Sequence, residues 1–241
     1  MLRTQQLTKR YGDFEAVSDL ELDVSPGEVY AFLGPNGAGK TTTIRMLMGI
    51  LVPTSGTARI RGLDCHADRA ELMRIVGYLP DTPTFYDFLR GREIVEFVAQ
   101  MHGMDDGAAR ERAAELLASF NLTEAAEDYA VNYSMGMKKK LGLACALIHE
   151  PRVLILDEPT SGLDPRASRE VQDRLLAIAG QGRTIFLSTH LLDMAERLSH
   201  RVGIIARGKL VAEGPVEQLR AVHGGEATLE EMFLGATAEA P

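Results

Sequence analysis

The sequence predicts an α/β fold: a mainly parallel sheet with an N-terminal antiparallel β subdomain and an inserted α-helical subdomain. Short apolar runs at residues 29–33 (VYAFL) and 153–156 (VLIL) are typical of strands buried on both faces of a parallel sheet. Between these runs, residues 84–148 have helical character. With 241 residues, 45% of them hydrophobic, the chain is long enough for one large domain with subdomains.

The elements before the insertion follow from alternation and from turn residues. Residues 3–8 and 16–24 alternate enough for two antiparallel strands, and residues 58–61 predict another strand. A helix is expected over residues 40–48, with Gly49 placed where a left-handed residue ends a helix. The first buried strand therefore leads into a glycine-rich loop, and this helix follows the loop.

The inserted segment and the part after it have clear start and stop signals. Apolar residues repeat along one face at 93–101 and at 109–120, which predicts two helices joined by the loop HGMDDG. A further helix opens at the Ser/Gly turn near Tyr133. Asp164 followed by Pro165 predicts the start of a helix that runs to about residue 179. The remaining expected strands are 184–188, 202–206 and 209–212, the last two joined as a hairpin through Arg207-Gly208.

Composition and charge restrict the function. A net charge of -8 gives no electrostatic footprint for nucleic acid, so none is expected as a partner. The two cysteines, Cys65 and Cys145, lack CxxC spacing, which argues against a disulfide framework or zinc site and fits a reducing cytosol. The start of the chain has no apolar run of the signal-peptide type, and the run at 141–148 is too short to span a membrane. We therefore expect a cytoplasmic chain whose membrane role comes from a partner.

The glycine-rich loop predicts nucleotide binding. Residues 34–41 (GPNGAGKT) fit the phosphate-loop pattern GxxxxGK[ST] in full and lie between a predicted strand and a predicted helix. Backbone N–H groups can wrap around the β-phosphate there, and the helix N-terminus adds a favourable dipole. Lys40 can reach the β and γ oxygens, and the Thr41 hydroxyl can hold Mg²⁺. The residues expected to bind ATP in this loop are Gly34, Pro35, Asn36, Gly37, Ala38, Gly39, Lys40, Thr41 and Thr42.

Two adjacent acids end the second apolar strand. Asp157 and Glu158 follow VLIL directly, at the strand end where ligands bind in open α/β sheets. Asp157 fits the role of orienting Mg²⁺ or its waters, and Glu158 would face the γ-phosphate and polarise the attacking water. The loop and the acids together predict a P-loop NTPase core that hydrolyses ATP.

With these motifs the chain resembles the ATPase subunit of an ATP-binding cassette (ABC) transporter, over roughly residues 2–234. Further motifs carry the resemblance: the signature-like YSMGM at 133–137, the D-loop-like SGLD at 161–164, the switch histidine His190 and the adenine-stacking aromatic Tyr11. The resemblance implies one domain over residues 1–241. Its catalytic core and β subdomain span 1–83 and 149–234, its helical subdomain spans 84–148, and a frayed tail occupies 235–241.

The resemblance also implies partners. ATP would lie between two subunits in a head-to-tail homodimer, or a pair of ABC subunits, that sandwiches two ATP. Ser134 and the N–H of Gly136 would contact the γ-phosphate of the partner subunit's ATP, and His190 would contact its own. A separate integral membrane permease subunit would hold the protein at the cytoplasmic face of the membrane.

The likeness extends to one group within the family and leaves alternatives open. The tail ATLEEMFLG (227–235), GYLPD and YSMGMKKKL resemble ATPases of the multidrug and antibiotic export group. An importer ATPase is the nearest rival, and a weakly hydrolysing, nucleotide-gated regulatory module is the alternative from another class. A small-molecule phosphotransferase would explain the phosphate loop but would leave the signature and the D-loop without a role.

Two positions depart from the family pattern. Asp81, in the loop GYLPD (77–81), replaces the usual glutamine, and we expect it to keep a role toward Mg²⁺ through a water although it cannot donate an N–H. Met135 replaces the first glycine of the signature, while Ser134 and Gly136 are kept. The lysines at 138–140 are interpreted as a solvated helix face.

Overall fold

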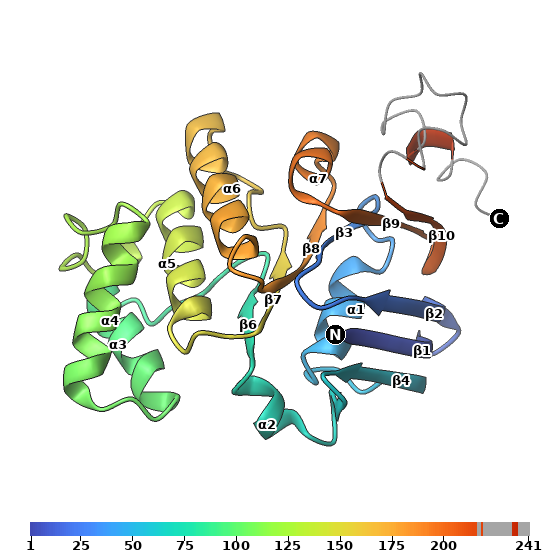
Figure 1. The fold of residues 1–241 in the computed structure, drawn as a ribbon, viewed down its shortest axis with the longest axis horizontal. Coiled ribbons are helices and arrows are strands. Elements are labelled where there is room, and N and C mark those ends of the chain that lie inside the picture. Colours follow the sequence, from blue (N-terminus) through green and yellow to red (C-terminus); the bar gives the residue numbers. More distant parts are fainter. Residues whose placement is uncertain (216–217, 219–232, 236–241) are drawn as a thin grey trace.

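The computed structural model describes residues 1–215, 218 and 233–235, and within these residues the strands form two sheets flanked by helices (Figure 1). One sheet has the strand order β2-β1-β4-β5, and the other has the order β10-β9-β3-β8-β7-β6. In the larger sheet β10 pairs antiparallel with β9, and the remaining neighbours run parallel. The predicted α/β fold is confirmed.

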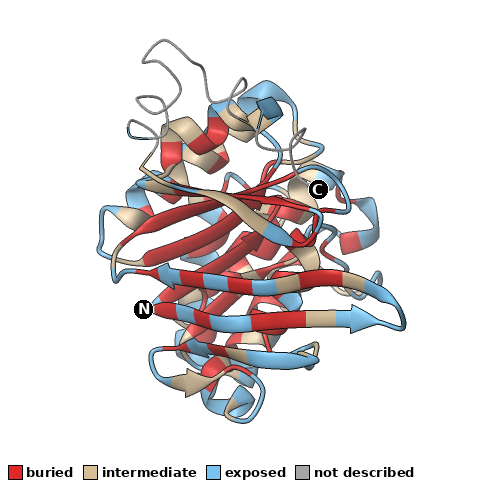
Figure 2. Ribbon diagram, turned by 90° about the vertical axis from the view of Figure 1, so that its right-hand side faces the viewer, coloured by how far each residue is buried: buried red, intermediate tan, exposed pale blue. Residues whose placement is uncertain are grey.

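The smaller sheet is the predicted antiparallel β subdomain. Its strands are β1 (Leu2–Tyr11), β2 (Phe14–Val24), β4 (Ser55–Ile60) and β5 (Leu63–Asp64). Buried and exposed residues alternate along β1 and β2, because one face of the sheet is packed and the other faces water (Figure 2). The sequence did not predict β5, since a strand of two residues has no period to detect.

The larger sheet is buried on both faces. All residues of β3 (Val29–Leu33), β7 (Val153–Asp157) and β8 (Thr184–Thr189) are buried. Along β3, residues 29, 31 and 33 join a hydrophobic cluster that includes the large helices, whereas Tyr30 and Phe32 join the cluster under the β subdomain. This double burial explains why the strands read as continuous apolar runs rather than as alternating ones.

Strand register brings three predicted functional segments to one edge of this sheet. Leu33 pairs with Thr189, and Asp157 pairs with Ser188, so β3, β7 and β8 end side by side. The next residues along the chain are Gly34, Glu158 and His190. The carboxyl ends of parallel strands form the usual ligand-binding edge of such a sheet.

The edge strand β6 (Val76–Leu79) corrects one prediction. Residues 77–81 were expected to form a loop, but 77–79 belong to this strand, which pairs in parallel with β7. The strand is only 4 residues long and contains Gly77, so its pattern is weak. Glycine is needed there because a Cβ would lie 2.1 Å from the backbone oxygen of Ala146. Asp81 therefore follows a strand end instead of lying within a long loop.

The helices α3 (Gly91–Met101), α4 (Asp106–Ser119) and α5 (Met135–Leu147) lie together beside the core, between β6 and β7 in sequence (Figure 1). The three helices predicted inside 84–148 are confirmed, including the one that opens at the Ser/Gly turn near Tyr133. α4 begins earlier than expected because Asp105 accepts hydrogen bonds from two N–H groups of its first turn. A short 3-10 helix (Ala130–Asn132) precedes α5. The predicted boundaries of the helical subdomain stay a prediction.

The remaining helices follow their capping signals. α1 (Lys40–Leu47) ends before Gly49, whose φ of 62° is the left-handed conformation that was predicted. α6 (Pro165–Ala179) begins at the predicted cap, where Asp164 accepts a hydrogen bond of 2.8 Å from the N–H of Ala167. The sequence missed two short helices, α2 (Arg69–Met73) and α7 (Leu192–Leu198).

The C-terminal part ends the larger sheet. β9 (Arg201–Ala206) and β10 (Lys209–Gly214) form the predicted hairpin through two residues with positive φ. The frayed tail predicted at 235–241, and the export-type motif at 227–235, fall outside the described residues except for 233–235. In the described part of the chain, none of the helices combines the length and apolar character needed to cross a membrane.

Candidate nucleotide-binding and hydrolysis site

A cleft of about 330 Å³ opens at the carboxyl edge of the larger sheet. It brings together the β1–β2 hairpin, the phosphate loop, Asp81 two residues after β6, and the acid after β7. The residues that line it are Tyr11, Phe14, Ala16, Pro35, Asn36, Gly37, Gly39, Lys40, Thr41, Thr42, Asp81 and Glu158. Segments far apart in sequence thus meet where the motifs predicted a nucleotide.

The phosphate loop has a shape that requires glycine. Gly37 and Gly39 have φ values of 80° and 111°, and a Cβ at Gly39 would lie 2.6 Å from the Ala16 backbone oxygen. Gly34 is as tightly enclosed, since its Cβ would lie 2.6 Å from the backbone oxygen of Ile205. Gly39 directly precedes α1, so the free N–H groups of that helix start open toward the cleft. Gly34 and Ala38 belong to the loop but do not line the cleft.

Lys40 is the first residue of α1 after this loop, and it is buried. Its ammonium donates to the backbone oxygens of Gly34 (2.6 Å) and Pro35 (3.2 Å). It also lies 3.5 Å from the Glu158 carboxylate. The predicted phosphate-binding cation and the predicted catalytic acid are therefore direct neighbours.

Asp157 is buried behind the loop and is held by two hydroxyl groups. Its carboxylate accepts a hydrogen bond of 2.5 Å from Ser188, and a second hydrogen bond joins it to Thr41. Burial raises the pKa of Asp157, and these hydrogen bonds oppose that rise. The Thr41 hydroxyl and the Asp157 carboxylate are hard oxygen donors in contact at the end of β7, which fits the preference of Mg²⁺ for oxygen ligands.

Glu158 has an unusual backbone and a direct histidine partner. Its φ of 48° is left-handed, which is uncommon for a residue other than glycine. Its N–H donates to the backbone oxygen and the hydroxyl of Ser188, at 3.2 and 3.1 Å. The carboxylate lies 3.0 Å from Nδ1 of His190, whose side chain is 46% exposed. The acid thus faces Lys40 on one side and His190 on the other.

Two aromatic side chains form the outer wall of the cleft. Tyr11 and Phe14 are 49% and 63% exposed at the β1–β2 turn, and both line the cleft. The ammonium of Lys9 lies 5.3 Å from the centre of the Tyr11 ring. The sequence pointed to Tyr11 but missed Phe14, although its place three residues further on across a Gly-Asp turn was a usable signal.

The lysines at 138–140 do not form the predicted solvated face. Lys139 is only 1% exposed, and its ammonium bonds to the backbone oxygen of Glu158 and to the Asp81 carboxylate. Lys140 forms an ion pair of 2.7 Å with Glu170. The prediction fails because the rotation of α5 turns Lys139 toward the core, which three identical residues in a row cannot reveal.

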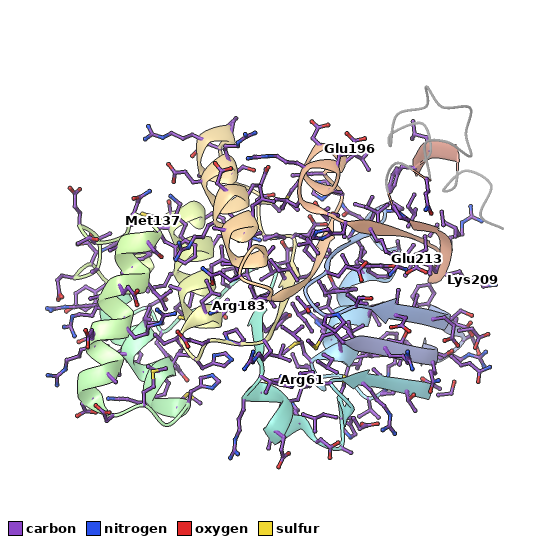
Figure 3. All side chains as sticks on the ribbon, in the orientation of Figure 1. Arg61, Met137, Arg183, Glu196, Lys209 and Glu213 are labelled. Carbon is purple, nitrogen blue, oxygen red and sulfur yellow. The ribbon has the colours of Figure 1, made fainter. Side chains whose placement is uncertain are left out.

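Ser134 and Gly136 lie away from this cleft, at the start of α5. Ser134 caps the helix by accepting a hydrogen bond of 3.2 Å from the N–H of Met137, which is labelled in Figure 3. Met135 is 46% exposed and lies over the D-loop-like turn, where a Cβ on Gly162 would be 3.6 Å from its Cγ. The structure therefore brings most predicted site residues together but not these two.

Ser188 is the polar residue of the site that the sequence prediction missed. It contacts both acids, although it is completely buried inside β8. A serine within the apolar run TIFLST, at the end of a predicted parallel strand, was the signal that could have pointed to it.

A phosphate loop after β3, two acids at the end of β7 in the same sheet, and a helical segment inserted between them in sequence define the class of ATP-binding cassettes. The family described as "ABC transporter" matches residues 17–161, and the chain belongs to this family. The family resemblance inferred from the motifs is thereby confirmed.

Several related proteins are similar to this chain over most of its length. The daunorubicin resistance ATP-binding protein DrrA3 of Streptomyces coeruleorubidus is 40% identical over 218 residues, which are 90% of this chain and 69% of that protein. The bacitracin transport ATP-binding protein BcrA of Bacillus licheniformis is 40% identical over 91% of this chain and 71% of its own length. A probable multidrug ABC transporter ATP-binding protein of Escherichia coli, YbhF, is 35% identical over 97% of this chain, which spans only 41% of that relative.

Solved structures agree on the fold. A structure described as the ATP-binding subunit of an ABC transporter matches with a TM-score of 0.90 and 32% identity, over 98% of this chain and 99% of the other. A dimeric ATP-binding cassette, described as a post-hydrolysis state bound to ADP and Pi, matches with a TM-score of 0.83 over 89% of this chain and 98% of the other. At 24% identity, the second likeness concerns the fold alone.

Proposed function

We propose that this chain is the ATP-binding and ATP-hydrolysing subunit of an ABC transporter that drives export through a separate integral membrane permease. The observation that carries the proposal is the single cleft that gathers Tyr11, the phosphate loop, Asp81 and Glu158. The names of the relatives, which refer to daunorubicin resistance and bacitracin transport, support export.

The residues in and around the cleft divide nucleotide binding and hydrolysis between them. The aromatic side chain of Tyr11 stacks on adenine, and the phosphate-loop N–H groups and Lys40 hold the phosphates. Thr41 and Asp157 would hold Mg²⁺, with Asp81 contributing through a water, and the bound ion would supply charge neutralisation at the phosphates. Glu158 accepts a hydrogen bond from the attacking water and polarises it. His190, 3.0 Å from Glu158, orients that carboxylate and contacts the γ-phosphate.

The position of Ser134 and Gly136 supports a site shared between two subunits. Both residues lie outside the cleft of their own chain, at a helix start whose N–H groups suit an anion. In a head-to-tail dimer they complete the partner's site around the γ-phosphate, so that two ATP hold the dimer closed. Hydrolysis removes this contact and shifts the population toward open subunits.

The permease is expected to cover an apolar surface on the side of the inserted helices. Tyr86, Phe88, Phe97 and Met101 are between 47% and 72% exposed. Tyr86 and Phe97 line a hollow of about 460 Å³, and Met101 lines a second one of about 890 Å³ that shares Val98 and Cys145 with the first. Phe88 packs against Tyr86, with 5.7 Å between the ring centres. Exposed aromatic patches of this kind mark interaction sites.

Photo-crosslinking in cells tests this surface. A crosslinking amino acid in place of Phe88 should capture an integral membrane protein, and one in place of Ile50, which is 52% exposed elsewhere, should not. Equal capture from both positions, or capture from neither, would contradict the assignment of this surface.

Turnover and dimerisation test the central proposal. Glu158→Gln should lower MgATP hydrolysis by at least about 10²-fold while nucleotide binding persists, because general-base catalysis contributes about 10²–10⁴-fold. The same variant should accumulate as an ATP-bound dimer in light scattering, and adding Ser134→Arg should return it to monomer. Equal and negligible hydrolysis by the wild type and Glu158→Gln would favour a regulatory module. The contact of Asp81 with Lys139, where the family has a glutamine, is the observation on which that second candidate rests.

A further inference from the structure

Lys139 is a buried cation that joins α5 to the catalytic edge of the sheet. Its side chain is 1% exposed. The ammonium donates a hydrogen bond of 2.5 Å to the backbone oxygen of Glu158 and lies 3.4 Å from the Asp81 carboxylate. A buried charge is retained only where partners compensate it, and both partners here belong to the proposed site.

The hydrogen bond from Lys139 to the Glu158 carbonyl stabilises an unfavourable backbone conformation. Glu158 has a left-handed φ of 48°, which is unfavourable for a side chain with a Cβ and persists only when its surroundings fix it. Ser188 fixes the N–H side of this residue. The carbonyl side is fixed by Lys139 and by the N–H of Ser161, at 3.2 Å. The direction of the Glu158 carboxylate depends on these contacts, because the side chain leaves the same Cα.

We propose that Lys139 is a positioning residue for Glu158, through which α5 controls the direction of the catalytic carboxylate. The proposal rests on the proposed function, in which Glu158 polarises the attacking water. It adds a link between the two nucleotide sites of a dimer. The same helix begins with Ser134 and Gly136, so a shift of α5 toward the partner's ATP also moves the Lys139 ammonium against Glu158 and Asp81 of its own chain.

Lysine suits this role better than glutamine. An ammonium carries three donors and a point charge, so it can bond a carbonyl and pair with a carboxylate at once. A neutral amide could serve the Glu158 carbonyl but could not neutralise Asp81. The lysine at 139 thus places a positive charge 3.4 Å from the half-exposed carboxylate at 81.

The test compares Lys139→Met with Lys138→Met, the same exchange one position earlier on the same helix. Met preserves the length and the apolar stem and removes the charge. We expect Lys139→Met to lower kcat at least about tenfold, with the Kd for a fluorescent ATP analogue changed less than about threefold. Lys139→Gln should lie between it and the wild type, because the amide keeps one donor. Lys138→Met should match the wild type.

Two further measurements separate positioning from a purely structural role. In nucleotide-free protein, the peptide 157–163 should exchange its amide hydrogens faster in Lys139→Met than in Lys138→Met, with melting temperatures within about 3 °C. In the Glu158→Gln background, Lys139→Met should change the residual turnover less than about twofold, since a residue acting through Glu158 has little left to affect.

The possible failures are distinguishable. If Glu158→Gln reduces turnover but Lys139→Met behaves like Lys138→Met, the proposal for Lys139 is overturned and the proposed function stands. A large loss of melting temperature, or an equal loss of turnover in the Glu158→Gln background, would also overturn it. If the wild type and Glu158→Gln hydrolyse ATP equally, the proposed function itself fails.

Discussion

His149, at the end of α5, should make the stability of this protein sensitive to acid. Its ring stacks on His102 with 3.8 Å between the centroids, and its Nε2 lies 3.1 Å from the backbone oxygen of Val76. Its Nδ1 is buried and has no hydrogen-bond partner among the described residues. Burial, helped by the nearby charges of His102 and Arg183, lowers the pKa of His149 from 6.5 to about 4.

The direction and size of the effect follow from linkage. The unfolded chain binds the proton more tightly than the folded one, so the contribution of His149 to stability is complete above pH 6.5 and is lost as the pH falls toward 4. A shift of this size corresponds to about 3 kcal/mol by about pH 4, and to roughly 2 kcal/mol at about pH 5. For a domain of this length, the loss at about pH 5 is a fall of roughly 4–8 °C in Tm.

Thermal unfolding of the wild type and His149→Gln checks this prediction. Gln keeps a donor for the Val76 carbonyl and does not titrate, so the variant should lose less Tm between about pH 7.5 and 5 than the wild type, by roughly 4–8 °C. His66→Gln, at an exposed histidine, is the matched control and should follow the wild type. The reasoning would be refuted if Tm fell equally with pH in the wild type and in His149→Gln, or if the NMR titration midpoint of His149 lay near 6.5.

Two other predictions concern contacts that position the site. Ser188→Ala should lower the free energy of unfolding by about 1.5–3 kcal/mol in urea titrations, because the buried Asp157 loses a charge-assisted hydrogen bond. Ser55→Ala, at an exposed serine, should leave the free energy of unfolding unchanged. Equal urea midpoints for Ser188→Ala and Ser55→Ala would contradict the prediction. Gly77→Ala should cost about 1–3 kcal/mol or more, because the new Cβ would lie 2.1 Å from a backbone oxygen. Gly180→Ala is the control, because the new Cβ there would lie 3.5 Å from the nearest atom, at an ordinary contact distance. If Gly77→Ala and Gly180→Ala unfold at the same denaturant concentration, β6 can move aside and the predicted clash at Gly77 is wrong.

Local chemistry explains what could be predicted about the fold. The run VYAFL matches β3 residue for residue, and Asp164-Pro165 marks the start of α6, because strand burial and helix capping depend on a few adjacent residues. The elements that were missed are short: β5, β6, α2 and α7 have 2 to 7 residues, too few for a reliable period. The order of strands in the sheet could not be read either, because it depends on pairings between distant segments.

The sequence by itself determined the phosphate loop, the two acids and the family, because these motifs have fixed spacing along the chain. Only the tertiary structure decided which residues face each other across the cleft. It brought Ser188 to both acids and His190 to Glu158 through strand register. It also selected Lys139 from three consecutive lysines, because successive residues of a helix point about 100° apart and packing alone decides which one is buried.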